Sequence, residues 1–91
     1  MAHNTELLRL LEHSLAMVNA RLVQVPDYAM FKSIKAQLET MLEDVQNDVI
    51  PSAQRKSHIN IGLLAARELE TTDPEFATTL MKTDYLYKRL A

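Results

Sequence analysis

Residues 25–45, VPDYAMFKSIKAQLETMLEDV, contain the pattern that the other segments of this chain must pack against. Proline is tolerated in the first turn of a helix and disfavours helical backbone at the residue before it. The pair Pro26-Asp27 therefore ends one helix and begins another, with Asp27 as the expected N-cap. Beyond it, apolar residues recur at the steps of one helical face: Phe31, Ile34, Leu38, Met41, Leu42 and Val45. Because a lone helix of this length is marginal in water, this face must be covered by other helices.

The same alternation of apolar stripes and helix-breaking residues extends in both directions. Pro51-Ser52 stops the chain and restarts it, and Asp73-Pro74 places an N-cap before a proline at the first helical position. We therefore predict an all-α fold, an antiparallel four-helix bundle with helices over residues 5–25, 28–46, 52–70 and 74–89. The stripes expected to be buried in the other three helices are Leu8, Leu11, Leu15, Val18, Leu22 and Val25, widened by Leu7 and Met17, then Ile59, Leu63, Ala66 and Leu69, then Phe76, Leu80 and Tyr87, with Thr83 between them.

The composition is that of one globular domain, residues 1–91, because 47% of the residues are hydrophobic and 24% are charged. The single glycine disfavours a sheet built from hairpins, whose tight turns need glycine. The absence of cysteine from the sequence excludes disulfides and cysteine nucleophiles and suits a reducing cytoplasm.

Charge and hydropathy narrow the classes of partner. The formal net charge is −2, which argues against a nucleic-acid binder that depends on phosphate contacts. No apolar run approaches the roughly 20 residues needed to span a bilayer, and residues 1–5 lack the basic segment and apolar core of a signal peptide. We therefore expect a cytoplasmic protein that binds neither nucleic acid nor membrane.

Reactive chemistry is not indicated. The three histidines, His3, His13 and His58, form no H-E-x-x-H motif, and no glycine-rich loop is present to hold phosphate. We expect no metal site, no cofactor and no catalytic residue. One alternative is a histidine phosphotransfer domain, since His58 is followed four residues later by Gly62, but Ile61 stands where such domains usually carry a lysine that supports the phosphate.

An acidic cluster lies at the end of the second predicted helix. Glu43, Asp44 and Asp48 oppose the helix dipole there. Either cations from the rest of the bundle compensate them, or they are kept for a partner despite their local cost. The cations that an antiparallel bundle could bring close are Arg55, Lys56 and Lys88.

Several segments together resemble a small family of bacterial immunity proteins. They are residues 14–18 (SLAMV), Arg21-Leu22, residues 25–28 (VPDY), Gln37-Leu38, Ile61-Gly62, Ala65-Ala66, residues 68–76 (ELETTDPEF), Leu80 and Tyr85. Their order and spacing match the family over most of the chain. The sequence departs from the family pattern in residues 47–54 and at Asp84, where an aromatic residue is expected.

That family protects bacteria against a type VI secretion effector that hydrolyses NAD(P)+. The resemblance implies a cytoplasmic, non-enzymatic protein that binds the cognate toxin domain and covers its nucleotide-binding cleft. For the partner-binding residues we predict the acidic side of the second helix with Tyr28 as an aromatic anchor: Tyr28, Glu39, Glu43, Asp44 and Asp48. The alternative function is a helical adaptor or regulatory module, and a homo-oligomer formed through Met30, Ile61 or Met81 stays open.

Overall fold

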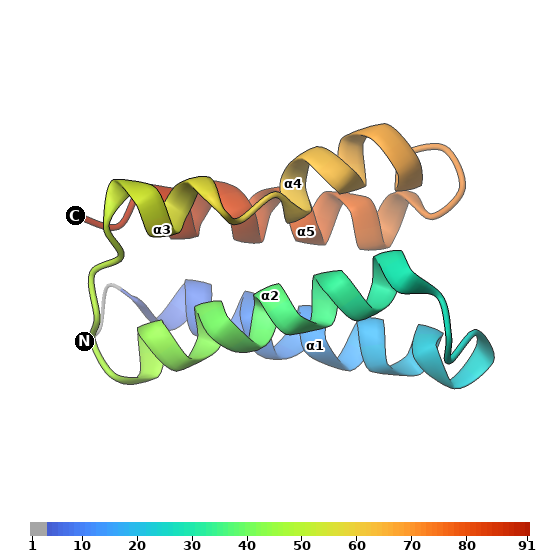
Figure 1. Cartoon of the computed structure of the whole chain (residues 1–91), viewed down its shortest axis with the longest axis horizontal. Helices are drawn as coiled ribbons and strands as arrows, with labels where there is room; N and C mark the ends of the chain where they lie inside the picture. Colours follow the sequence, from blue (N-terminus) through green and yellow to red (C-terminus); the bar gives the residue numbers. More distant parts are fainter. Residues whose placement is uncertain (1–3) are drawn as a thin grey trace.

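The computed structural model describes residues 4–91, and these residues form helices without any strand (Figure 1). The elements are α1 (Thr5–Gln24), α2 (Ala29–Gln46), α3 (Ala53–Ser57), α4 (Ile61–Leu64), the π-helix η2 (Ala65–Leu69) and α5 (Pro74–Lys88). The predicted all-α bundle is confirmed, with α3, α4 and η2 together in the place of the third helix. In Figure 1, α1 and α2 lie side by side below, and α5 lies above them with α3 and α4 along its length.

The core confirms the stripe predicted for α2. Five of its six predicted residues are buried, and Leu42 is partly buried against them. From α5, Phe76, Leu80 and Tyr87 are fully buried, as predicted, and so is Thr83 between them. The buried residues of α1 are Leu7, Leu11, Ser14, Met17 and Val18.

The buried stripe of α1 contains Leu11 and Val18 from the predicted stripe and Leu7 and Met17, which were expected to widen it. Its centre is Ser14, whose hydroxyl lies 3.2 Å from the Thr83 hydroxyl of α5, so two buried polar groups satisfy each other. Leu8, Leu15 and Leu22 are only partly buried at the edge of the core. Val25 is exposed, because α1 ends at Gln24 and the chain turns there.

The sequence predicted that α2 and α5 begin at the pairs Pro26-Asp27 and Asp73-Pro74. Pro74 occupies the first turn of α5 and Asp73 precedes it as the N-cap residue, as predicted. At α2 the N-cap is Tyr28 in an extended conformation, so the expectation for Asp27 was wrong. Asp27 lies fully in solvent, 4.0 Å from the Lys32 ammonium, because the turn at Pro26 places it one residue too early to cap.

The predicted continuous helix over residues 52–70 is wrong, because the chain leaves the helical conformation between Ser57 and Ile61. Side chains of α2 hold both sides of this break. Gln37 accepts a hydrogen bond from the Asn60 backbone N–H at 2.8 Å and donates to the Asn60 side-chain oxygen at 2.7 Å. Asp44 accepts two hydrogen bonds from Arg55 on the other side.

The break and the π-helix change which residues of this segment are buried. The buried set is Ile59, Ile61, Ala65 and Leu69. Leu63 and Ala66, predicted to be buried, are exposed instead. A π-helix takes more residues per turn than an α-helix, so a stripe extrapolated with α-helical spacing loses its register here.

Candidate partner-binding surface

The sequence offered histidines and carboxylates as candidate ligands, and the structure shows where they lie. Within residues 4–91 no group of three or more histidine, aspartate or glutamate side chains could bind a metal ion. His13 lies on the exposed side of α1, and His3 lies outside the described residues. His58 is the C-cap of the five-residue α3, and Gly62 belongs to the next helix, so the spacing that suggested a phosphotransfer domain does not lie on one helix.

Asp44, one of the predicted partner-binding residues, is buried. Its carboxylate accepts hydrogen bonds from Arg55 at 2.7 and 2.8 Å and from the Tyr87 hydroxyl at 2.6 Å. Burial opposes the charge of Asp44, but these hydrogen bonds outweigh it and keep the pKa of Asp44 below its ordinary value. Burial, together with the bond to Asp44, raises the pKa of Tyr87 to about 12. This Asp44–Arg55–Tyr87 cluster joins α2, α3 and α5.

Of the two explanations for the acidic residues, compensation within the bundle applies to Asp44, because Arg55 pairs with its carboxylate. Asp44 is therefore not available to bind a partner. Lys88 pairs instead with Asp84 at 3.0 Å, and Lys56 donates to the backbone carbonyl of Leu90. Glu43 and Asp48 are exposed and are free to face a partner.

The remaining predicted residues occupy different parts of α2. Glu39 and Glu43 lie one turn apart on its exposed side, and Asp48 follows its C-terminal end with a φ of 55°. Tyr28 precedes the first turn and is 46% exposed, with its ring edge against Phe31. An 18-residue helix is about 27 Å long, so Tyr28 and Asp48 stand at opposite ends of the molecule. The structure thus brings the three acids toward one end and leaves Tyr28 apart from them.

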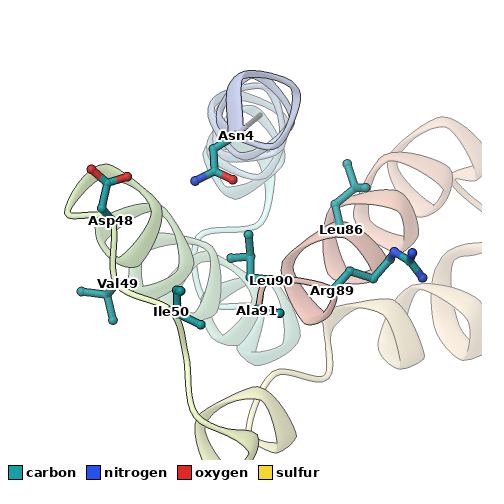
Figure 2. Close-up of a pocket in the computed structure, with 8 residues that line it drawn as sticks. All are labelled: Asn4, Asp48, Val49, Ile50, Leu86, Arg89, Leu90 and Ala91. Atoms are coloured by element: carbon teal, nitrogen blue, oxygen red, sulfur yellow. The ribbon is translucent and has the colours of Figure 1, made fainter. Parts of the chain in front are cut away.

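Exposed apolar residues gather at the same end as Asp48, and the sequence prediction missed them. The exposed Val49 and Ile50, with the partly buried Leu86 and Leu90, line an open hollow of about 670 Å³ between the α2–α3 connection and the end of α5 (Figure 2). A second hollow lies between α4 and α5, lined by Leu63, Met81, Tyr85 and Arg89. The pair Val49-Ile50 next to a proline in a turn was the available signal, because turns seldom need two β-branched apolar residues.

The comparisons with known proteins agree with this fold. The model of the Tsi6 family matches residues 6–89. The structure of Tsi6 from Pseudomonas aeruginosa is similar, with a TM-score of 0.82, 25% sequence identity, and coverage of 91% of this chain and 85% of that one. A chain in the structure of Tse6 in complex with Tsi6 shares the fold, with a TM-score of 0.83, 24% identity, and coverage of 91% and 87%. A search of curated protein sequences found no match.

A small helical bundle whose surface carries exposed acidic and apolar side chains suits the class of protein-binding modules. Because the family model matches nearly the whole chain, the class can be made specific: this chain belongs to the Tsi6 family. The family resemblance noted from the sequence is thereby confirmed.

Some residues that carry this resemblance hold the fold together. Gln37 fixes the break at Asn60, and the Gly62 N–H donates to the Asp84 carboxylate at 2.7 Å. Arg21 donates to both oxygens of Asp73, at 2.6 and 3.0 Å, and its guanidinium lies 4.5 Å from the centre of the Phe76 ring. These hydrogen bonds lower the pKa of Asp73 and raise that of Arg21. Their positions in the family pattern are explained by folding.

No helix among the described residues combines the length and apolar character that crossing a membrane requires.

Proposed function

We propose that this chain is an immunity protein that binds the cognate toxin domain of a secreted effector and blocks it by covering its active-site cleft. The observation that carries the proposal is membership of the Tsi6 family over residues 6–89. It is supported by near-complete overlap with a chain from the structure of Tse6 in complex with Tsi6. The resemblance to the immunity family further implies that the toxin is an NAD(P)+ glycohydrolase.

The geometry suits inhibition by occlusion. A bundle whose buried side-chain nitrogen and oxygen atoms all have hydrogen-bond partners within the described residues presents a preformed surface, so that little ordering is needed on binding. Glu39, Glu43 and Asp48 are exposed acids toward one end of this surface, and their negative charge speeds the encounter with a partner surface that carries basic groups. Tyr28 is an exposed aromatic residue that a partner could bury.

In this function the chain acts as a cytoplasmic binding protein without catalysis or cofactor. The biology depends on the shape and charge of the outer surface, so each inhibitor molecule neutralises one toxin molecule. An adaptor or regulatory module would share the same fold but would leave the toxin active, and the two functions are separated by the following experiment.

The toxin domain encoded beside the gene for this chain is expressed in bacteria with and without the chain, and growth and cellular NAD+ are followed. The proposal predicts loss of growth and of NAD+ with the toxin domain alone and recovery of both on co-expression. The variant Glu39→Lys/Glu43→Lys should lower the recovery, whereas Glu68→Lys/Glu70→Lys, also two exposed acids, should not. Growth arrest that the chain does not relieve would assign it another function.

A further inference from the structure

The two hollows, one at the end of α5 and one along its side next to α4, share one lining residue. Arg89 lines both the hollow beside Ile50 and the hollow beside Leu63. In Figure 2 the Arg89 side chain extends away from Ile50. Together these side chains form a band around the end of α5, here called the α5 band: Val49, Ile50, Leu63, Tyr85, Leu86 and Arg89.

The α5 band exposes more apolar surface than a solvated helix end needs. Ile50 is 62% exposed, Tyr85 59% and Leu63 55%. Scattered apolar side chains are normal on a protein surface, but several side by side around a hollow mark an interaction site. Both hollows are open to solvent, so they suit the side chains of another protein better than an enclosed small molecule.

Arg89 gives the α5 band a positive charge that can bind a carboxylate of a partner. Lys88, the neighbouring cation, is paired with Asp84, and Asp84 also accepts from Gly62. Arg89 has no carboxylate partner among residues 4–91, and its guanidinium lies 5.2 Å from the centre of the Tyr85 ring. Stacking on Tyr85 restricts the arginine before any partner arrives, which lowers the entropy lost on binding. Tyrosine and arginine are also the residue types enriched where binding energy concentrates.

We infer that the α5 band anchors the toxin domain of the cognate effector, with Arg89 bound to a carboxylate of that domain and Ile50 and Tyr85 holding apolar side chains on either side of it. The inference rests on the proposed function and adds a second kind of contact to it. The acids of α2 attract basic groups of the toxin domain, whereas Arg89 binds an acidic group of it. Asp48 also lines the Ile50 hollow, so the acidic surface and the α5 band are continuous around this end of the molecule.

The test is binding of the purified chain to the adjacent-gene toxin domain, measured by calorimetry. Arg89→Glu, Tyr85→Ala and Ile50→Asp should each weaken binding at least about 30-fold, the effect of losing a central contact. Arg89→Lys, which keeps the charge, should weaken it less than Arg89→Glu does. The matched controls are exposed residues outside the α5 band, Arg67→Glu and Val23→Asp, which should stay within about 3-fold of the natural chain. Thermal unfolding checks that every variant is folded.

The outcomes separate the inference from the proposed function. Full-strength binding by the three α5 band variants would overturn the inference that the toxin domain binds the α5 band, while leaving the proposed function intact. No binding by the natural chain would overturn both. A homodimer that the α5 band variants dissociate, with toxin binding unchanged, would assign the α5 band to a second copy of the chain and overturn the inference.

Discussion

Replacing Asp44 tests whether its carboxylate is held for the fold or for a partner. In Asp44→Ala the Tyr87 hydroxyl, inside a fully buried side chain, loses its acceptor, which costs about 1–3 kcal/mol. The lost ion pair adds less, because 44% of the Arg55 side chain is exposed and water replaces the carboxylate. We expect a total destabilisation of about 2–4 kcal/mol. For a domain of this size that lowers the melting temperature by roughly 10–25 °C.

A double-mutant cycle in guanidinium denaturation isolates the hydrogen bond. Tyr87→Phe should destabilise the natural chain by about 1–2 kcal/mol but should be nearly neutral or stabilising in Asp44→Ala, where the hydroxyl is already without an acceptor. Equal effects of Tyr87→Phe in both backgrounds would refute the coupling. So would an Asp44→Ala chain as stable as the natural one.

The same cluster predicts a pH dependence. The pKa of Asp44 is lower in the folded chain, so its contribution is present above the unfolded pKa of about 3.9 and is lost as pH falls through the folded pKa. The pKa of Tyr87 is raised to about 12, so its contribution is present below about 10 and is lost as pH rises from there toward 12. Unfolding free energy measured across pH should decline at both ends, and Tyr87→Phe should reduce the alkaline decline; an unchanged alkaline decline would contradict this assignment.

Further predictions concern the turns and the surface. Gly62→Ala places a Cβ 2.9 Å from the Asp84 carboxylate oxygen and should destabilise the chain by about 1–3 kcal/mol in thermal unfolding; an unchanged melting temperature would show that Asp84 yields freely. Asp48→Gly relieves a positive φ and should stabilise by up to about 1 kcal/mol, whereas a loss of stability would mean that the aspartate side chain itself supports the turn. Glu43→Lys should slow association with the toxin domain in stopped-flow measurements and leave unfolding within about 0.5 kcal/mol, and an unchanged association rate would move the steering charge elsewhere.

Sequence periodicity sufficed for elements whose pattern is local. The α2 stripe from Phe31 to Val45 and the Asp73-Pro74 start of α5 follow from spacing and backbone chemistry within a few residues. The break near His58 does not, because its supports are Gln37 and Asp44, which lie more than ten residues earlier in the chain. Long-range hydrogen bonds of this kind override a helix-compatible local sequence.

The candidate surface was harder to predict than the fold. Asp44 adjoins the buried Val45 and lies three residues after Met41, so its place beside the stripe was a signal that a charged residue could be buried there. What the sequence could not supply was the partner, Tyr87, which lies 43 residues away. The α5 band likewise joins Ile50, Leu63 and Tyr85 from three separate segments, and only the folded chain places them around Arg89.

A titration of toxin activity tests the central claim most directly. Purified chain is added in increasing molar ratio to a fixed amount of the adjacent-gene toxin domain, and NAD+ hydrolysis is measured. Occlusion by a binding surface predicts a linear fall in rate that reaches zero at one chain per toxin domain. Inhibition complete at a small fraction of that ratio would indicate that the chain acts catalytically, and undiminished hydrolysis at excess chain would show that it does not cover the cleft.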